Sequence, residues 1–221
     1  MNKILVTGTS NGIGLEVAKR FLDEGYEVIG FDLEESKIEN KHYTHYVLDI
    51  RNKDSLPKIS DISYIFHNAG KQNDDDINNN LVGTINVMEA YMDQPLKAVL
   101  FNASASARNG FEFPYYVASK AGLVGYMKHV ASTLAKKGVL VNSISLGGVY
   151  TDSNRPVIEN KELFNKIMDS TPLKKWTTLE EVCDWVYFLL INNKSMSGQD
   201  ILIDNGENDL NNTFVWPSSN I

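Results

Sequence analysis

Residues 3–14 have the sequence KILVTGTSNGIG, in which a short apolar run leads straight into a glycine-rich turn. The run 3–7 is typical of a buried parallel strand, and the pattern after the turn is that of an amphipathic helix. Gly8 permits a tight turn, Gly12 allows the backbone to approach a pyrophosphate closely, and Gly14 lets the helix pack near the sheet. Strand, glycine turn and helix in this order predict a dinucleotide-binding α/β unit.

The rest of the chain repeats this alternation of apolar runs and helical patterns. Six further strands are predicted at residues 27–31, 45–48, 62–66, 97–101, 139–144 and 201–203. Helices are expected at 77–92 and 114–137, one amphipathic helix lies within 154–171, and Thr178 with Glu181 forms a capping box for another. We therefore expect an α/β fold of the Rossmann type, doubly wound, with a seven-stranded parallel sheet and helices on both faces.

Three segments connect or follow these elements. Residues 33–41 are short for a full helix, so a turn or a reduced helix is expected, and 51–58 predict a short helix. Residues 152–172 form the longest insertion, and such segments commonly act as active-site lids. We expect one dinucleotide-binding catalytic domain over 1–206 and a C-terminal tail over 207–221, which docks on a neighbouring subunit or lies over the site.

Composition argues against several classes of function. The chain has 221 residues, a formal net charge of -7 and a single cysteine. The acidic balance argues against a nucleic-acid or anionic-membrane partner. The lone Cys183 allows no internal disulfide and makes no zinc site. Three carboxylates at 74–76 could suggest a metal, but they are more typical of a solvated first helical turn. Without a membrane-length apolar run or a signal peptide, we expect a cytoplasmic protein with no metal.

The second predicted strand leads into Asp32, 18 positions after Gly14. In dinucleotide folds a carboxylate at this place accepts hydrogen bonds from the adenosine ribose, and it also repels a 2′-phosphate. No Arg or Lys lies in the glycine turn or directly after Asp32 to hold such a phosphate. The pattern therefore predicts NAD rather than NADP as cofactor. Asp49 and Ile50, after the third strand, are placed to contact the adenine edge.

Tyr116 and Lys120 lie four residues apart in a predicted helix that begins near Pro114. Residues at this spacing share one helix face. An ammonium group near a tyrosine favours the phenolate and lowers the tyrosine pKa, which is about 10 in a free side chain. The pair is a candidate proton donor and acceptor. Standing alone, such a pair is more often an aromatic ring packed under a lysine.

Small or polar residues follow two neighbouring strands. His67, Asn68, Ala69 and Gly70 come after the strand predicted at 62–66, and Ser104 follows the next strand, 12 positions before Tyr116. Ligands in open α/β sheets bind outside the carboxyl ends of the strands. His67 could act as a base, but a strand-end histidine is more often packed or hydrogen-bonded locally.

These residues resemble, in their order and spacing, the short-chain dehydrogenase/reductase family in its single-domain branch. The resemblance covers about residues 3–206. Its matching residues are Thr7, Gly8, Gly12, Gly14, Asp32, Asp49, Asn68, Ala69, Gly70, Asn80, Ser104, Tyr116, Lys120, Thr151, Asp204 and Gly206. It implies an NAD(H)-dependent oxidoreductase that interconverts a secondary alcohol and a ketone by hydride transfer. The family commonly forms dimers or tetramers, so a homodimer or homotetramer acting on a small molecule is expected.

The resemblance also implies roles for individual residues. Tyr116 would be the general acid or base, and Lys120 would lower its pKa and hold the nicotinamide ribose. Ser104 would hydrogen-bond the substrate oxygen, and Asn80 would hold a water that links Lys120 to solvent. The cofactor-binding residues would be Gly8, Ser10, Asn11, Gly12, Ile13, Gly14, Asp32, Asp49, Ile50, Asn68, Ala69, Gly70, Tyr116, Lys120, Val149 and Thr151.

Some alternatives remain open at the level of sequence. Ser104 is one residue closer to Tyr116 than is typical of the family, so Ser106 is the fallback for its role. The segment between Gly70 and Asn80 is about ten residues shorter than usual. A dinucleotide-sensing regulator with the same fold is a second possible function, and a sugar-nucleotide epimerase is a third, although little chain remains for a separate substrate domain. The substrate itself is not readable.

Overall fold

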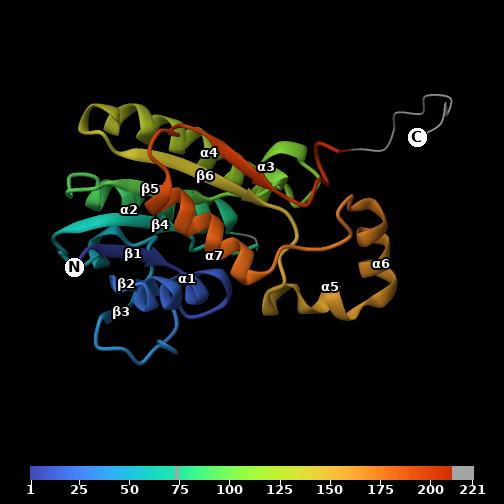
Figure 1. The fold of residues 1–221 in the computed structure, drawn as a ribbon, viewed down its shortest axis with the longest axis horizontal. Helices are drawn as coiled ribbons and strands as arrows, with labels where there is room; N and C mark the ends of the chain where they lie inside the picture. The colour runs from blue at the N-terminus through green and yellow to red at the C-terminus, as the bar shows by residue number, and fades with distance from the viewer. Residues whose placement is uncertain (73–74, 211–221) are drawn as a thin grey trace.

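Seven parallel strands form one sheet in the computed structural model, which describes residues 1–72 and 75–210 (Figure 1). The strands are β1 (Lys3–Thr7), β2 (Glu27–Asp32), β3 (Tyr43–Val47), β4 (Ile62–His67), β5 (Ala98–Asn102), β6 (Leu140–Leu146) and β7 (Asp200–Ile203). Their order across the sheet is β3-β2-β1-β4-β5-β6-β7. The strand order changes direction between β1 and β4, which is the place where doubly wound folds bind their ligands. The predicted Rossmann-type fold is confirmed.

Helices cover both faces of the sheet. They are α1 (Gly12–Asp23), α2 (Gly83–Tyr91), α3 (Ser106–Asn109), α4 (Pro114–Leu134), α5 (Arg155–Glu159), α6 (Lys161–Ser170) and α7 (Leu179–Tyr187). One apolar core joins Phe21 of α1 and Val186 of α7 to the sheet, and the other joins Met88 of α2 and Met127 of α4 to it. Successive side chains of a strand point to opposite faces, so the same strands supply both cores.

Several element boundaries differ from the sequence predictions. β3 begins at Tyr43, two residues early, because Tyr43 pairs with Val28 of β2. β6 continues to Leu146, which was expected in a loop, because the strand pairs with β7 through this residue. Residues 33–41 contain no helix, and within 51–58 only the 3-10 turn Lys53–Ser55 forms. The capping box of Thr178 with Glu181 is present as predicted.

The helix expected over 77–92 has two parts. It begins with the π-helical segment η2 (Ile77–Val82), and α2 follows from Gly83. Close packing against α4 accompanies the wider turn, since a Cβ on Gly122 would come within 2.8 Å of Leu81. Asp76, expected in a solvated first turn, is only 1% exposed. That expectation was wrong for Asp76, which is buried at the start of η2.

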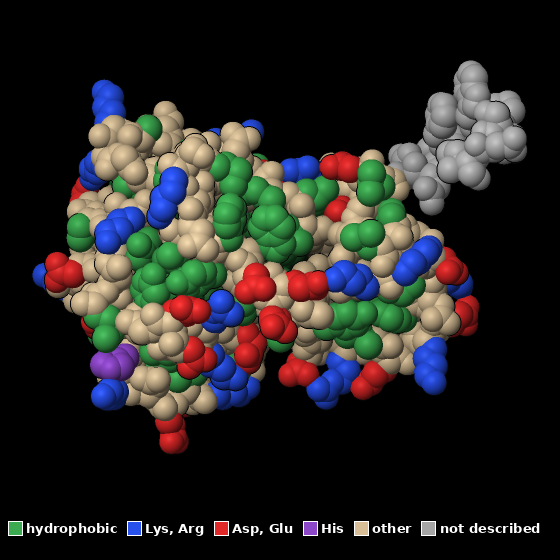
Figure 2. All heavy atoms as spheres, in the orientation of Figure 1, with side chains coloured by type: hydrophobic (Ala, Val, Ile, Leu, Met, Phe, Trp, Pro, Cys, Tyr) green, Lys and Arg blue, Asp and Glu red, His purple; other side chains and the backbone are tan. Residues whose placement is uncertain are grey.

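The segment expected to hold one amphipathic helix holds two, α5 and α6, after a 3-10 turn at Asp152–Asn154. The break falls at Asn160, whose side chain accepts a hydrogen bond from the Leu163 amide and so starts a second helix. Neither helix contains a fully buried residue. Both lie at one end of the molecule, beyond the end of β6 (Figure 1), and Figure 2 shows a notch between them and the rest of the surface.

The remaining expectations concern the ends and the surface of the chain. In the stretches 1–72 and 75–210, the helices are all too short or too polar to cross a bilayer. The tail expected over 207–221 lies outside the described residues from 211 onward, as do Asn73 and Asp74 of the acidic run. Cys183 is a free, buried thiol, as expected for a small packed residue.

Candidate functional site

The glycine turn forms a bare backbone surface at the start of α1. Gly8 and Gly12 have φ values of 76° and 55°, in the left-handed region that favours glycine. A Cβ on Gly14 would overlap the Gly8 carbonyl oxygen, so α1 packs closely on the end of β1. A Cβ on Gly12 would meet only Thr151 Cγ2, at 4.0 Å. Asn11 makes no side-chain cap bond, so the first N–H groups of α1 stay available to an anionic group.

Asp32 ties this turn to the end of β2. Its carboxylate accepts hydrogen bonds from the amides of Ser10, at 2.8 Å, and Glu34, at 3.1 Å. An ionised carboxylate has about four lone-pair sites, so it keeps acceptor capacity for the hydroxyls of a ligand. The Ser10 hydroxyl donates to the Glu34 carbonyl oxygen at 3.0 Å, which closes the loop after β2 onto the turn. Asp32 is therefore held where the sequence predicted it.

A cation also reaches this turn, and the sequence pattern did not predict it. Lys37 Nζ donates a hydrogen bond to Asn11 Oδ1, although 26 residues separate them. The Asn11 amide nitrogen donates to Glu34 at 2.9 Å. The loop after β2, which forms no helix, folds back and brings Lys37 to the turn. Two carboxylates and one ammonium group therefore surround the place expected for the adenosine ribose.

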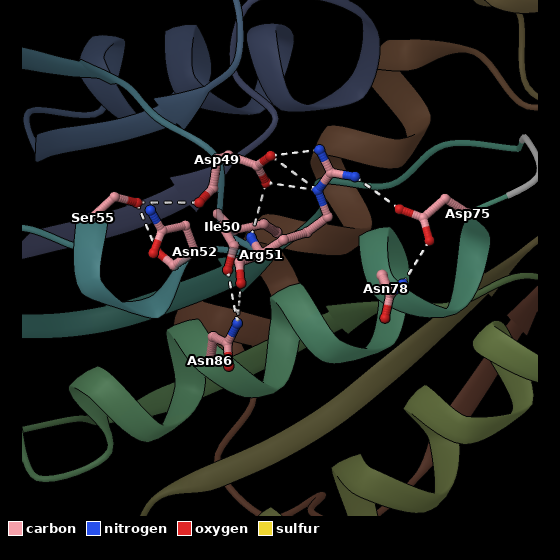
Figure 3. A network of polar contacts seen from close by, with 8 residues as sticks. All are labelled: Asp49, Ile50, Arg51, Asn52, Ser55, Asp75, Asn78 and Asn86. Carbon is pink, nitrogen blue, oxygen red and sulfur yellow. Dashed lines mark hydrogen bonds and ion pairs between the residues drawn. The ribbon is translucent and has the colours of Figure 1, made fainter.

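Asp49, which was expected to contact the adenine, belongs to a network of polar contacts in the loop after β3 (Figure 3). The guanidinium of Arg51 contacts its carboxylate at 2.6 Å through Nη2 and holds the pKa of Asp49 below its usual range. Arg51 Nη1 also donates to Asp75 at 2.8 Å, and Asn86 Nδ2 donates to the Ile50 carbonyl at 3.1 Å. These contacts fix the loop after β3 against η2 and α2, so an adenine contact at Asp49 would share the carboxylate with Arg51.

The loop after β4 lies between the glycine turn and Lys120 and contains Asn68, Ala69 and Gly70. The amides of Asn68 and Ala69 donate to Thr7 Oγ1 at 3.0 and 2.9 Å, which binds the end of β4 to the end of β1. A Cβ on Gly70 would lie 3.1 Å from Asn80 Oδ1 and 3.3 Å from Lys120 Nζ. Gly70 therefore leaves room for the side chains of Asn80 and Lys120, which the sequence predicted to act together, to lie close to each other.

The pair Tyr116 and Lys120 lies in the first two turns of α4. Lys120 Nζ is 5.7 Å from the centroid of the Tyr116 ring and donates to the Asn102 carbonyl at the end of β5, at 2.8 Å. Ser104 lies beyond the same strand, and its side chain acts to lower the pKa of Tyr116. Tyr115, one residue earlier, is 62% exposed. The structure thus brings Tyr116, Lys120 and Ser104 together at the carboxyl edge of the sheet.

Burial governs the titration of this pair. It raises the pKa of Tyr116 to about 12, and the charges of Glu112 and Asp76 add to the rise while the hydrogen bond from Ser104 opposes it. Burial likewise lowers the pKa of Lys120 to about 8. The sequence predicted a lowered pKa for Tyr116, and the structure corrects this. Desolvation is the largest cause of the raised pKa, and the Lys120 ammonium group is directed to the Asn102 carbonyl.

Asn80 is fully buried in η2 and links two segments. Its Oδ1 accepts from the Lys71 amide at 2.8 Å, and its Nδ2 donates to the Lys71 carbonyl at 2.9 Å and to Ser119 Oγ at 3.0 Å. Ser119 precedes Lys120 in α4. Asn80 therefore holds the loop after β4 against the helix that carries the lysine.

Sequence reasoning missed two carboxylates at this site, Glu112 and Asp76. Glu112 lies four residues before Tyr116 and accepts a hydrogen bond from Gln72 Nε2 at 2.7 Å, so it spans the gap between the loops before α4 and after β4. Desolvation raises its pKa above the usual range. Glu112 lies just before α4, and Asp76 is buried just before η2, so local sequence patterns marked neither of them as part of the site.

The loop after β6 brings Val149 and Thr151 to the site. Val149 is buried and pairs with Thr177, and Thr151 contacts Ser153 Oγ at 2.8 Å. α6 rests on this loop through Phe164, whose ring lies 6.2 Å from that of Tyr150 in the loop and meets Trp176 edge to face at 5.2 Å. The predicted lid is therefore attached close to the two residues expected to contact a nicotinamide.

His67 is buried at the end of β4 and packs on the neighbouring strand. Its ring stacks on Phe101 with 4.7 Å between centroids, and burial lowers its pKa to about 3. Neither ring nitrogen has a hydrogen-bond partner in the described part of the chain. A histidine that is buried and neutral acts as a packing residue, in line with the local role favoured from the sequence.

Known proteins are similar to this chain over most of its length. The model of the family described as Enoyl-(Acyl carrier protein) reductase matches residues 8–208. A curated 3-oxoacyl-(acyl-carrier-protein) reductase from Buchnera aphidicola is 27% identical to this chain, over 91% of this chain and 95% of its own length. An L-xylulose reductase from Caenorhabditis elegans is also 27% identical, over 92% of this chain and 94% of its own.

Solved structures share the fold along nearly the whole chain. A short chain dehydrogenase family protein from Francisella tularensis is 26% identical, with a TM-score of 0.82 over 94% of this chain and 98% of its own. A 4-hydroxyisoleucine dehydrogenase complexed with NADH has a TM-score of 0.84 at 24% identity, over 94% and 99% of the two chains. A 2-deoxy-d-gluconate 3-dehydrogenase from Agrobacterium tumefaciens with bound NADP has a TM-score of 0.82 at 22% identity, over 93% and 96%.

Proposed function

Because the chain belongs to the short-chain dehydrogenase/reductase family of oxidoreductases, we propose that it interconverts a secondary alcohol and a ketone with NAD(H). One observation carries the proposal. The Tyr116 hydroxyl lies against Ser104, with the buried amine of Lys120 one helical turn away, at the carboxyl edge of the sheet. This is the edge at which doubly wound folds bind their ligands.

These side chains suffice for the proton chemistry of the reaction. In ketone reduction Tyr116 donates its phenolic proton to the substrate oxygen, and in alcohol oxidation its phenolate accepts the hydroxyl proton. Ser104 donates a hydrogen bond to the same oxygen and stabilises the negative charge that develops there. When bound, the nicotinamide ring supplies or accepts the hydride and, in its oxidised form, adds a positive charge.

Lys120 suits the exchange of this proton with solvent. Its pKa of about 8 lies near a neutral working pH, where a proton relay is most effective. The amine is held by the Asn102 carbonyl, and Gly70 leaves space between it and Asn80. We expect Asn80 to position the water through which Lys120 reaches solvent.

The residues present fit a dinucleotide. The space that a Cβ on Gly12 would fill, together with the uncapped start of α1, would take the diphosphate. Asp32 would hold the adenosine ribose, and Asp49 with Ile50 would border the adenine. Ser10, Asn11, Ile13 and Gly14 shape the turn, and Val149 with Thr151 would border the nicotinamide carboxamide.

Asp32 supports NAD over NADP, because its carboxylate would repel a 2′-phosphate. Lys37 is the group that could reverse this preference. We expect at least a ten-fold higher kcat/KM with NAD than with NADP, since close like charges cost more than about 1.4 kcal/mol. Lys37→Met should leave the NAD value nearly unchanged. A clear NADP preference that Lys37→Met abolishes would show that the lysine, not Asp32, sets the choice.

The segment 152–172 supports a lid over the substrate. Its helices α5 and α6 have no fully buried residue, so they can move without opening a core. Leu163 on α6 is 42% exposed, and Phe111 and Phe113, just ahead of the Tyr116 helix, are 89% and 64% exposed. These side chains favour a substrate that is partly hydrophobic.

A homodimer or homotetramer is the assembly we propose. Small residues on α4 support it, since a Cβ on Gly125 would meet nothing within 4 Å and the helix surface there is flat enough for close packing. Light scattering coupled to size exclusion measures the mass directly. A single species near the 24.8 kDa of the monomer would refute this assembly.

The decisive experiment is a screen of secondary alcohols and ketones followed by nicotinamide absorbance. On any hit, Tyr116→Phe should lower kcat by about 100-fold or more, because it removes the proton donor. Tyr115→Phe is the matched control and should stay near the wild-type value. If Tyr116→Phe keeps near-full turnover, the mechanism is wrong. If dinucleotide binds but the whole screen is silent, the alternative of a dinucleotide-sensing regulator gains support.

A further inference from the structure

The Ser104 hydroxyl receives two hydrogen bonds from one residue, Ser106. Ser106 Oγ donates to Ser104 Oγ at 2.9 Å, and the Ser106 amide donates to the same oxygen at 3.3 Å. Ser104 is 7% exposed and Ser106 is 1% exposed, so water competes little for these contacts. A serine hydroxyl has one proton and two lone pairs. With both lone pairs occupied by donors from Ser106, the Ser104 hydroxyl has to donate its proton away from Ser106.

The side of Ser104 that faces away from Ser106 is the side on which the proposed reaction takes place. Its neighbour there is Tyr116, and the Ser104 side chain acts to lower the pKa of the Tyr116 hydroxyl, which favours the phenolate. Each hydroxyl in this chain therefore donates a hydrogen bond to the next group: Ser106 donates to Ser104, and Ser104 donates to Tyr116 or to a substrate oxygen. A hydroxyl that accepts a hydrogen bond becomes a better donor, since bonds in a chain polarise one another.

We propose that Ser106 is a positioning residue that fixes the Ser104 hydroxyl as a donor toward Tyr116 and the substrate oxygen. This inference rests on the proposed function, because Ser104 acts on a substrate only if the reaction occurs. The sequence offered Ser106 as the alternative to Ser104 for binding the substrate oxygen. In this proposal Ser106 instead orients the Ser104 hydroxyl.

The backbone around Ser104 supports this role by holding both serines in place. The amides of Ala103 and Ala105 donate to the carbonyls of Ile144 and Leu146 of β6, each at 2.8 Å, so the chain beyond β5 stays paired to the sheet. α3 begins at Ser106, and the Ala107 amide donates to the Ser104 carbonyl at 3.0 Å. With this backbone fixed, the direction of the Ser104 proton depends on the side chain of Ser106.

The test compares Ser106→Ala with Ser106→Thr, which keeps the hydroxyl. Ser143→Ala is the matched control, since Ser143 is also fully buried and donates to a different acceptor, Asp200 Oδ1, at 2.7 Å. On a hit from the alcohol and ketone screen, Ser106→Ala should lower kcat about three- to ten-fold with little change in KM. In ketone reduction, the alkaline limb of the kcat profile, which reports the ionisation of Tyr116, should also move to higher pH. Ser106→Thr should restore both values.

A second readout does not depend on turnover. In protein labelled with ¹³C at tyrosine Cζ, the Tyr116 signal is assigned by its loss in Tyr116→Phe, and its ionised fraction is measured at pH 11.5. A pKa of about 12 corresponds to about one quarter ionised at this pH. Ser106→Ala should lower this fraction to about half its value or less, and Ser106→Thr should restore it.

The outcomes separate the two proposals. A silent substrate screen together with the expected change in the Tyr116 signal would overturn the proposed function and keep the directed hydrogen bond. An unchanged Tyr116 signal in Ser106→Ala would overturn the positioning role even if the enzyme is active. Equal losses of kcat in Ser106→Ala and Ser143→Ala would also overturn it, because a buried hydroxyl would then matter only for packing.

Discussion

Lys120 should make the protein more stable as the pH rises from 7 to 9.5. The side chain is 5% exposed, and burial lowers its pKa from 10.5 in the unfolded chain to about 8 in the fold. Between these values the unfolded state binds more protons than the folded state, so the free energy of unfolding rises with pH. Below the folded pKa the full cost of burying the charge is present, and it disappears as the pH approaches 10.5.

The size of the effect follows from the two pKa values. Their difference of about 2.5 pH units corresponds to a cost of about 3 kcal/mol at low pH, of which about 2 kcal/mol should be recovered by pH 9.5. Asp76 and Glu112 act in the opposite sense and are already included in the lowered value. The pKa of Tyr116, raised to about 12, places its titration above this range of pH.

The assay is urea unfolding at constant ionic strength, followed by the fluorescence of the three tryptophans. Lys120→Met is the reference, because it has no titrating group at this position. The difference in unfolding free energy between wild type and Lys120→Met should change in favour of wild type by about 2 kcal/mol from pH 7 to 9.5. Parallel pH curves would refute the reasoning, and a change in favour of Lys120→Met would mean that the carboxylates dominate.

Three further predictions concern the site and its surroundings. Gly14→Ala should destabilise the fold by about 3 kcal/mol or more in urea unfolding, because its Cβ would overlap the Gly8 carbonyl oxygen; a loss below about 1 kcal/mol would contradict the packing. Glu112→Gln should lower the pKa of Tyr116 and move the rise of kcat with pH in alcohol oxidation down by about 0.5 pH unit; an upward shift would reverse the sign assigned to this charge. Limited proteolysis should cut first within 152–172, where the helices lack a core, and saturating NAD should slow these cuts; a first cut elsewhere would count against the lid.

The sequence predicted those parts of the fold that depend on local patterns. The apolar runs marked all seven strands, and the glycine turn, Asp32 and the Tyr116 helix lie where they were expected. Each of these features uses a residue whose local chemistry is restrictive, such as a left-handed glycine or a proline in a first helical turn.

Features that depend on contacts between distant segments were not predictable in this way. The contact of Lys37 with Asn11 needs the path of the whole loop after β2. The approach of Leu81 to Gly122, the burial of Asp76 and the desolvation that raises the pKa of Tyr116 all depend on the packed fold. Asn160 carried a helix-capping residue type, but a single amphipathic pattern concealed the break that it makes.

The π-helical turn at Ile77–Val82 has a consequence for length changes in the chain. A π turn adds about one residue to a helical turn, so removing one of the three successive asparagines 78–80 would allow an ordinary helix to form. Because the extra residue is accommodated within this one turn, the segments on either side would keep nearly the same phase along the helix. A difference of one residue in length is therefore tolerated here with little movement of Asp76 relative to α2, and alignments with relatives should place gaps in this segment.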